Sequence, residues 1–343
     1  MEKIKVEASV TYDVLIGTGL LEKSGELIKN KTGVCRAFII TDDNVEKLYY
    51  EKVNNSLEKS GFKTDKFVFK NGEDSKNAQT LINILETMAD KKFTRSDIIV
   101  ALGGGVVGDT AGFAAATYQR GIRFIQIPTT FLAAIDSSVG GKTAVNLNSG
   151  KNLFGAFHQP SLVICDTDTL KTLSREIFLD GVAEAVKYAV LKDESICSDI
   201  DTDIEGAIKK CIEIKRDIVG KDEFDTGERQ LLNLGHTLGH SIESLSGYKI
   251  THGHAVSIGM VLACRGGEKM GITQKGVTYK LINILKEFGL PTSCPYNSEE
   301  LANHALGDKK RDGDSITLVI PERFEKCVLH KVPIAELSVF AGE

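Results

Sequence analysis

No run of apolar residues in this sequence is long enough to span a membrane, and the first seven residues, MEKIKVE, lack the apolar core of a signal peptide. The seven cysteines are scattered, and no two of them form a CxxC pair. This pattern indicates a reducing compartment and argues against a metal cluster held by thiolates. Together these absences predict a cytoplasmic protein that does not enter a membrane.

The sequence also has no excess of positive charge. Its formal net charge is −5, and its isoelectric point is near 5.9. A protein with this balance has no broad basic field to hold nucleic acid or an anionic membrane surface. We therefore expect a small-molecule partner, and a local group of side chains must bind any anion.

Neither an internal repeat of about 20 to 50 residues nor a proline-rich or low-complexity linker divides the chain. Its 343 residues, 42% of them hydrophobic, are too many for one typical domain and enough for two. Without a linker the two domains should pack closely, and the active site is expected in the cleft between them.

Short β-branched runs alternate with helical stretches in the first half of the chain. The predicted strands are residues 37–40, 66–69, 97–102 and 123–127. This alternation predicts an α/β N-terminal domain, residues 1–178, with a mostly parallel, Rossmann-like sheet covered by helices. Helical periodicity dominates from residue 179 to 343, which predicts a mainly α-helical C-terminal domain with one short late strand at residues 315–320.

A glycine-rich segment follows the predicted strand at residues 97–102. It runs from Gly103 to Phe113 as GGGVVGDTAGF and continues into small, helix-forming residues. A strand, a glycine turn and a helix start can bind a pyrophosphate, because backbone N–H groups and the positive end of the helix dipole face the anion. The alternative is that the glycines only make a tight turn, and the segment alone leaves both interpretations open.

An ordinary dinucleotide-binding fingerprint fits this segment poorly. Gly103, Gly105 and Gly108 match GxGxxG, but the acidic residue expected about 20 positions later is absent. An earlier acid can take its place at the adenosine ribose. Asp42, which follows a predicted strand, is the first candidate, and Glu73 is the second.

Four polar residues recur at helical spacing near the middle of the second domain. Spacings of four, three and four place them on one face of a predicted helix. A solvated polar face is the alternative, but such a stripe favours Lys and Glu, whereas this one carries His, Asn and Arg. The four residues are Arg229, Asn233, His236 and His240.

Further metal-binding groups flank this segment. Glu184 and Lys187 lie one helical turn apart, and His252 and His254 follow the predicted helix. Two imidazoles and one carboxylate form an open catalytic site for zinc, with positions left for water or substrate oxygens. The spacing does not decide which histidines bind, because a buried histidine is more often a structural hydrogen-bonding group.

Taken in order, these segments resemble the 3-dehydroquinate synthase family, within the sugar phosphate cyclase superfamily, over nearly the whole chain. The matching segments are 103–113, 128–146, 150–152, 184–188, 229–240, 252–253 and 308–310. The resemblance implies a lyase that converts 3-deoxy-D-arabino-heptulosonate 7-phosphate to 3-dehydroquinate and phosphate in the shikimate pathway. It implies transient oxidation by NAD, phosphate elimination, re-reduction and intramolecular aldol closure.

The resemblance also implies the cofactors, NAD in the first domain and zinc or cobalt in the second. The implied metal ligands are Glu184, His236 and His252. The implied NAD-binding residues are Asp42, Asn44, Glu73, Lys76, Gly103, Gly104, Gly105, Val106, Asp109, Thr129, Thr130, Asp136, Ser137, Lys142, Lys151 and Thr172.

Around the substrate, the resemblance implies a cationic cluster suited to a phosphate and a carboxylate. The family is usually dimeric, and Arg120 is expected to reach the neighbouring subunit's site. The implied catalytic residues are Asp136, Lys142, Asn152, Lys187 and His240. The implied substrate-binding residues are Arg120, Lys142, Asn152, Lys215, Arg229, Asn233, His240, Lys309 and Lys310.

Two residues depart from the family pattern, and two other enzyme classes remain as alternatives. His158 stands where tyrosine is usual, and His254 stands where glutamate is usual. A cyclase similar to 2-deoxy-scyllo-inosose synthase is the first alternative, but Lys215 and Arg229 suit a substrate carboxylate that its sugar lacks. A metal-dependent polyol dehydrogenase is the second, and it would release NADH, whereas a cyclase would not.

Overall fold

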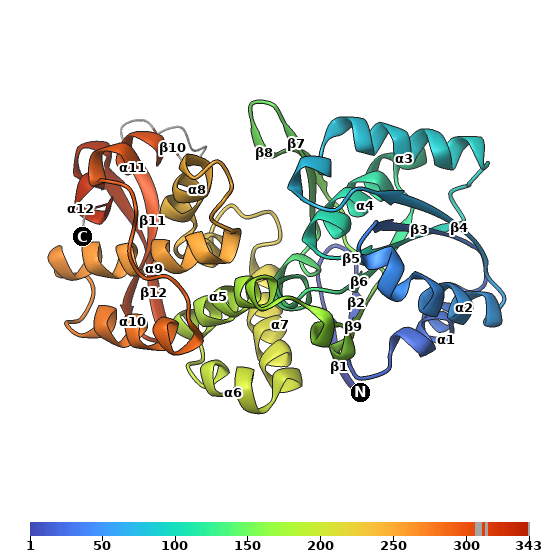
Figure 1. Ribbon diagram of the computed structural model, residues 1–343, viewed down its shortest axis with the longest axis horizontal. Helices are drawn as coiled ribbons and strands as arrows, with labels where there is room; N and C mark the ends of the chain where they lie inside the picture. Colours follow the sequence, from blue (N-terminus) through green and yellow to red (C-terminus); the bar gives the residue numbers. More distant parts are fainter. Residues whose placement is uncertain (306–310, 313–314, 342–343) are drawn as a thin grey trace. The chain divides into compact units, whose positions relative to one another are not determined.

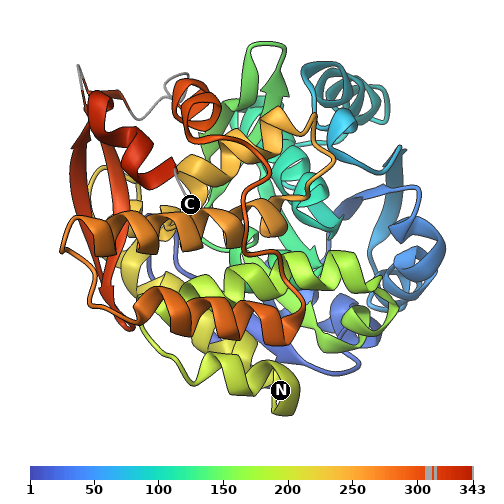
Figure 2. The same cartoon turned by 60° about the vertical axis from the view of Figure 1, so that its left-hand side comes forward.

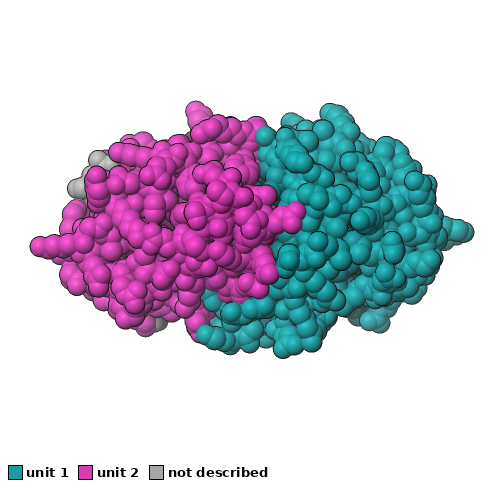
Figure 3. Space-filling model, turned by 90° about the horizontal axis from the view of Figure 1, so that it is seen from below, with its two compact units in different colours: residues 1–173, 215–224 teal, residues 174–214, 225–343 magenta. Residues whose placement is uncertain are grey.

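The computed structural model describes residues 1–305, 311–312 and 315–341. The chain separates into two compact units, which Figure 3 draws in different colours. Unit 1 comprises Met1–Leu173 and Lys215–Phe224, and unit 2 comprises Ser174–Ile214 and Asp225–Glu343. Helix α7 (Ile204–Lys221) therefore begins in unit 2 and ends in unit 1.

Unit 1 is built on a seven-stranded sheet with the order β1-β2-β9-β6-β5-β3-β4. β1 is antiparallel to β2, and every other neighbouring pair is parallel. The predicted parallel sheet is confirmed, and its four predicted strands are β3 to β6. The strands are β1 (Glu2–Val6), β2 (Tyr12–Gly17), β3 (Arg36–Asp42), β4 (Lys63–Phe69), β5 (Ile98–Gly103), β6 (Arg123–Pro128) and β9 (Leu162–Asp166).

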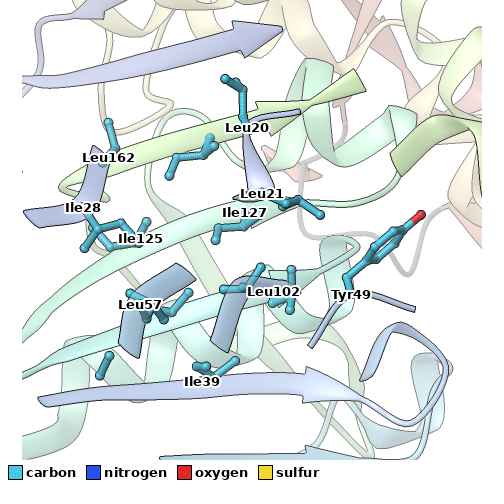
Figure 4. Close-up of a cluster of buried hydrophobic side chains, with 14 of the residues drawn as sticks. Leu20, Leu21, Ile28, Ile39, Tyr49, Leu57, Leu102, Ile125, Ile127 and Leu162 are labelled. Atoms are coloured by element: carbon cyan, nitrogen blue, oxygen red, sulfur yellow. The ribbon is translucent and has the colours of Figure 1, made fainter. Parts of the chain in front are cut away.

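Helices cover both faces of this sheet (Figure 1). In β3, Ala37 and Ile39 belong to the core on one face, and Phe38 and Ile40 belong to the core on the other. The first core includes residues of α1 and α2 (Figure 4), and the second includes residues of α3 and α4. Burial on both faces explains why the strands read as continuous apolar runs. The helices are α1 (Ser24–Thr32), α2 (Glu51–Lys59), α3 (Ala78–Asp90) and α4 (Gly105–Thr117).

The connections leave β3 and β5 in opposite directions. β3 continues through α2 to β4 on one side, whereas β5 continues through α4 to β6 on the other. In doubly wound sheets, ligands bind at the carboxyl ends of the strands where the direction of winding reverses. Asp42 ends β3 and Gly103 ends β5, so both stand at this point.

A separate hairpin of β7 (Lys142–Leu147) and β8 (Gly150–Phe157) packs on α4. Gly112 permits this approach, because a Cβ there would collide with the side chain of Thr143. Phe113 meets Phe154 edge to face, with ring centroids 4.8 Å apart. Short helical turns complete the unit at η1 (Leu21–Lys23), η2 (Glu46–Tyr50), η3 (Glu73–Ser75), η4 (Tyr118–Arg120), η5 (Ala133–Ser137) and η6 (Thr167–Thr172).

Unit 2 is mainly helical, as predicted. The predicted late strand is β11 (Ser315–Arg323), and it pairs antiparallel with β10 (Arg311–Asp312) and β12 (Lys326–Pro333), which were not predicted. Residues of α8, α9, α12 and this sheet share one core, and Figure 2 shows α9 and α10 side by side. The other elements are α5 (Arg175–Leu191), α6 (Ile196–Thr202), η7 (Glu228–Asn233), α8 (His236–Leu245), α9 (His252–Lys269), α10 (Val277–Phe288), α11 (Ser298–Ala305), η8 (Ile334–Glu336) and α12 (Leu337–Ala341).

The segment from residue 229 to 240 is not one helix. The turn η7 ends before Leu234, whose ψ is 124°, and Gly235, whose φ is 79°. α8 begins only at His236. The prediction of a single polar helical face across this segment is therefore wrong, because the chain breaks where Gly235 packs against α9.

Among the described residues, no helix combines the length and the apolar character that crossing a lipid bilayer requires.

Candidate metal centre and cofactor residues

Three side chains of unit 2 place potential metal ligands around one point. Glu184 lies on α5, and His236 and His252 are the first residues of α8 and α9. The Nε2 atoms of His236 and His252 lie 3.4 and 3.3 Å from the same oxygen, Oε1 of Glu184. One ligand atom from each of the three residues lies within 4.8 Å of the others. Two imidazoles and a carboxylate at this spacing match the donor set of an open catalytic zinc site.

The second nitrogen of each imidazole has an acceptor that orients the ring. Nδ1 of His236 lies 3.1 Å from the carbonyl oxygen of Leu234, and Nδ1 of His252 lies 3.3 Å from Oε2 of Glu243. With the proton on Nδ1 and none on Nε2, each imidazole would present the lone pair of Nε2 to a metal ion. Metal-binding histidines are generally held in this way, so the residues fit a divalent metal ion.

His254 faces a different group. Its Nδ1 lies 2.7 Å from the hydroxyl oxygen of Thr251 and 3.1 Å from Oδ1 of Asp180. The same carboxylate oxygen accepts the backbone N–H of Gly253 at 2.9 Å, near the start of α9. Of the two neighbouring histidines, His252 is the one that lies beside Glu184.

Glycines allow α8 and α9 to approach closely. A Cβ at Gly259 would collide with the carbonyl oxygen of Gly235. Gly235 is itself left-handed, and a Cβ there would lie 2.7 Å from the carbonyl oxygen of Val256. Because the two helices begin with His236 and His252, this contact helps to set the separation of the two rings, whose centroids are 5.2 Å apart.

The electrostatic environments of the two histidines differ. Burial lowers the pKa of His236 well below its ordinary value, against the opposing charge of Glu184, so this imidazole is neutral near pH 7. Burial also acts to lower the pKa of His252, but hydrogen bonds to Glu184 and Glu243 outweigh it and raise the pKa to about 10. The other oxygen of Glu184 faces Lys187, whose Nζ lies 2.5 Å from Oε2, and both side chains are 1% exposed.

In unit 1, Lys76 joins two of the predicted cofactor and substrate residues. Its Nζ donates to Oδ2 of Asp109 at 2.7 Å and to Oδ1 of Asn152 at 2.6 Å. Burial raises the pKa of Asp109, although the adjacent ammonium of Lys76 lowers it in part. Asn152 is left-handed, with φ of 53°, and its backbone N–H donates to Oδ1 of Asn146 at 2.8 Å.

The same network continues to two further predicted residues. Oε1 of Glu73 accepts a hydrogen bond from Nδ2 of Asn146 at 2.7 Å and lies 3.9 Å from Nζ of Lys151. The side chain of Asn146, which was not predicted, therefore bridges Glu73 and the backbone of Asn152.

The glycine turn has the predicted form. β5 ends at Gly103, and α4 begins at Gly105. A Cβ on Gly104 would lie 3.0 Å from Cγ2 of Thr130, and one on Gly105 would lie 3.2 Å from Oγ of Ser137. The turn thus packs directly against the segment that follows β6. The backbone N–H of Thr129 donates to the carbonyl oxygen of Gly103 at 3.0 Å.

The other predicted cofactor residues of unit 1 follow the carboxyl ends of the parallel strands. Oδ1 of Asp42 accepts the backbone N–H groups of Asn44 and Val45 at 2.9 and 2.8 Å, and burial raises the pKa of Asp42. Lys215 donates to the carbonyl oxygen of Asp136 at 2.7 Å and also contacts its carboxylate. Val106 lies on α4, Thr172 ends η6 after β9, and Lys142 begins β7.

Three predicted substrate residues lie in the described part of unit 2. Arg229 is 1% exposed and lies in η7, as does Asn233. His240 is exposed on α8, and its ring centroid lies 5.4 Å from that of His236 and 5.8 Å from that of His252. An exposed imidazole thus stands beside the candidate metal ligands.

The three remaining predicted substrate residues are Arg120, Lys309 and Lys310, and the structure does not place any of them beside the candidate metal ligands or the glycine turn. Arg120 is exposed in η4, which precedes β6, whereas Thr129 follows the other end of that strand. Arg120 therefore stands at the amino end of the parallel sheet, opposite the glycine turn. Lys309 and Lys310 lie outside the described residues.

Sequence reasoning missed two carboxylates beside the candidate metal centre. Glu243 contacts His252, and Asp180 holds the start of α9. A signal for Glu243 was present, because positions 236, 240 and 243 share one face of a helix. Asp180 carries no comparable signal, since its partners lie far along the chain.

Comparison with known proteins finds relatives that match nearly the whole chain. The family models described as 3-dehydroquinate synthase N-terminal and C-terminal match residues 66–180 and 181–311. The chain is 44% identical over 342 residues to the 3-dehydroquinate synthase of Streptococcus suis (strain 05ZYH33), covering 96% of each protein. It is 44% identical over 341 residues to that of Clostridium kluyveri, covering 96% of this chain and 95% of the relative.

A solved structure has the same fold. It is a crystal structure of 2-deoxy-scyllo-inosose synthase complexed with carbaglucose-6-phosphate, NAD⁺ and Co²⁺. The two chains are 26% identical, each is covered over 100% of its length, and the TM-score is 0.90. Together, the two family models and the full-length relatives show that the chain belongs to the 3-dehydroquinate synthase family.

Proposed function

We propose that this protein converts 3-deoxy-D-arabino-heptulosonate 7-phosphate to 3-dehydroquinate and phosphate, a step of the shikimate pathway. The 44% identity to full-length relatives named for this activity carries the proposal. The group of Glu184, His236 and His252 supports it, because the reaction oxidises a hydroxyl and needs a Lewis acid there.

Glu184, His236 and His252 would hold the metal, zinc or cobalt. When bound, the ion supplies Lewis acidity that lowers the pKa of a substrate hydroxyl and polarises a carbonyl. The buried ammonium of Lys187 contacts Oε2 of Glu184, and the other oxygen, Oε1, faces both imidazoles. The solved cyclase with Co²⁺ and NAD⁺ supports both cofactors.

The glycine turn of unit 1 would hold the pyrophosphate of NAD. Its backbone N–H groups precede α4, where the positive end of the helix dipole favours an anion. Asp42 stands at the end of the adjacent strand β3, in the position of an acid that binds ribose hydroxyls. When bound, NAD would supply reversible hydride acceptance, so no net NADH is expected.

Asn152 is suited to hold the departing phosphate. Its side-chain oxygen accepts the hydrogen bond of Lys76, so its two N–H bonds point away from that contact and can donate to phosphate oxygens. Lys142 is exposed and adds a positive charge from unit 1. From unit 2, we assign Asn233 and His240 to the phosphate and Arg229 to the substrate carboxylate.

A second candidate function is cyclisation of another sugar phosphate, because the solved 2-deoxy-scyllo-inosose synthase matches over the full length at a TM-score of 0.90. The proposed roles of Lys215 and Arg229 argue against it, since each would bind a substrate carboxylate that this sugar phosphate lacks. The higher identity to 3-dehydroquinate synthases, 44% against 26%, also favours the first function.

The experiment is to incubate the purified protein with NAD, Zn²⁺ and the heptulosonate phosphate, and to follow phosphate and 3-dehydroquinate together. Glucose 6-phosphate and sedoheptulose 7-phosphate serve as control substrates. Equal release of phosphate and dehydroquinate without NADH supports the proposal. Turnover of a control sugar alone would transfer the protein to another cyclase, and net NADH would indicate a dehydrogenase.

We also propose a homodimer in which Arg120 completes the site of the other subunit, since it stands at the opposite end of the sheet from the glycine turn. The test mixes Arg120→Ala and His252→Ala chains, each expected to be inactive alone. Renewed activity in the mixture supports the exchange, and inactive mixed dimers refute it.

The cytoplasmic location and the domain boundary at residues 178 and 179 remain predictions from the sequence.

A further inference from the structure

Glu243 makes a buried contact that the proposed function does not use. Its Oε2 lies 3.3 Å from Nδ1 of His252, and its side chain is 7% exposed. It stands on α8, seven residues after His236, so α8 contributes both a candidate ligand and the partner of the other histidine. A buried carboxylate in hydrogen-bond contact with an imidazole fixes the orientation of that ring.

We propose that Glu243 is a positioning residue for the metal centre. Its carboxylate accepts the Nδ1–H of His252, selects the tautomer whose Nε2 has a lone pair, and aims that atom at the position beside Glu184. The inference rests on the proposed function, because it assigns Glu243 a role toward the metal that Glu184, His236 and His252 would hold.

The two histidines differ in how firmly their surroundings hold them. His236 is 13% exposed, and its Nδ1 faces the carbonyl oxygen of Leu234, which the break before α8 fixes. His252 is 33% exposed, so packing restrains its ring less. A charged acceptor binds an imidazole N–H more strongly than a neutral carbonyl does. Glu243 therefore supplies by hydrogen bonding the restraint that burial supplies to His236.

A competing role for Glu243 is that of a ligand. One atom each of His240, Glu243 and His252 also lies within 4.8 Å of the others. In that arrangement, His252 would have to give Nδ1 to a metal ion, whereas its Nε2 already faces Glu184. The positioning role is favoured because Nε2 of His252 then faces the metal position beside Glu184, while Nδ1–H donates to Glu243.

The experiment compares Glu243→Gln and Glu243→Leu with the unchanged protein. Glutamine keeps a neutral acceptor for Nδ1–H, whereas leucine removes the acceptor and puts an apolar side chain in its place. Glu268→Gln is the control, because Glu268 lies near the other end of α9 and its Oε1 accepts the backbone N–H of Thr278 at 2.9 Å. Each metal-free protein is titrated with Zn²⁺ against a chromophoric chelator, and the visible absorption spectrum of its Co²⁺ form is recorded.

We expect one Zn²⁺ per chain in every folded variant. The affinity should fall about tenfold in Glu243→Gln and about 100-fold in Glu243→Leu, and it should not change in Glu268→Gln. The Co²⁺ absorption bands should shift in both Glu243 variants, because the ligand geometry around the ion changes. The Co²⁺ spectrum separates this role from a loss of packing, which would lower stability without shifting the absorption bands of the folded variants.

Two results would overturn the inference. One is a wild-type Zn²⁺ affinity and Co²⁺ spectrum in folded Glu243→Leu. The other is a second equivalent of metal in the unchanged protein that both Glu243 variants lose while the first stays tight, since Glu243 would then be a ligand. Failure of the proposed function is distinguishable, because the unchanged protein would then lack cyclase activity whatever its metal affinity.

Discussion

Lys76 donates a hydrogen bond from Nζ to the side-chain oxygen of Asn152 at 2.6 Å, and this contact decides which end of the amide faces outward. Asn152→Asp would keep an acceptor for Lys76 but would replace the two outward N–H donors by a carboxylate oxygen. We expect kcat/KM for the sugar phosphate to fall by about 100-fold or more, because a charged hydrogen bond is lost and a repulsion is added. Steady-state kinetics test this expectation, and a loss below about threefold would remove Asn152 from the phosphate site.

Replacing either of the neighbouring histidines separates their roles. His252→Ala should abolish stoichiometric metal, because Nε2 of His252 faces Glu184. His254→Ala should keep the metal and lower stability by about 1 kcal/mol, since it removes a hydrogen bond at the start of α9. Elemental analysis of the dialysed proteins gives the metal content. One metal ion per chain in His252→Ala would refute the ligand assignment.

Metal binding should release a proton from His252. Its pKa is raised to about 10, so the metal-free protein carries an imidazolium there at pH 8, whereas His236 is already neutral. A ligand nitrogen must be deprotonated, and the metal affinity should therefore rise about tenfold per pH unit between pH 7 and 9. Calorimetric titration with Zn²⁺ in buffers of different ionisation enthalpy counts the protons. Binding without proton release would contradict the raised pKa.

The same pKa shift predicts how the metal-free protein responds to alkali. The folded pKa of His252 lies above the ordinary value of 6.5, so the stabilising contribution of the imidazolium is complete below about pH 6.5. It should then decline as the pH rises toward 10. Urea unfolding of the metal-free protein at several pH values measures the decline, and His252→Ala is the control that should lack it.

Lys187→Met should destabilise the metal-free protein. The substitution leaves Glu184 buried without the ammonium at Oε2, and breaking such a buried pair costs about 3–5 kcal/mol. Added Zn²⁺ should restore much of the stability, because the ion supplies positive charge to the same carboxylate. Urea unfolding with and without Zn²⁺ tests both parts, and equal stabilities of the two metal-free proteins would contradict the expectation.

Gly259→Ala should weaken both the fold and the metal centre. The added Cβ would collide with the carbonyl oxygen of Gly235 and push α8 away from α9. We expect a loss of about 1–3 kcal/mol, together with weaker Zn²⁺ binding. Gly220→Ala in α7 is the matched control, since its Cβ would lie 3.6 Å from the carbonyl oxygen of Glu7. That substitution should stabilise by about 0.5–1 kcal/mol, because alanine favours a helix.

Much of the fold could be predicted because its signals are local. The buried strands of unit 1 are continuous apolar runs, and the glycine turn directly follows one of them. The strand β10 was missed because it has only two residues, and β12 because its residues are mostly exposed or half-buried without a regular alternation. The break before His236 was missed because Gly235 is held left-handed by contacts with α9, which a helical spacing does not reveal.

Less of the candidate site than of the fold could be predicted from the sequence. Spacing alone left open whether His252 or His254 would bind a metal, and only the resemblance to a family named one of them. The structure separates the two through Asp180, a residue of α5 that faces His254. Such contacts join elements that are distant along the chain, so no local pattern contains them.

The candidate metal ligands all belong to unit 2, whereas the glycine turn and its partners all belong to unit 1. A substitution can therefore alter the residues of one unit and leave the contacts among those of the other unit in place. A substitution in the parallel sheet would disturb the proposed cofactor residues without touching the contacts that join Glu184, His236 and His252, because those contacts lie within unit 2.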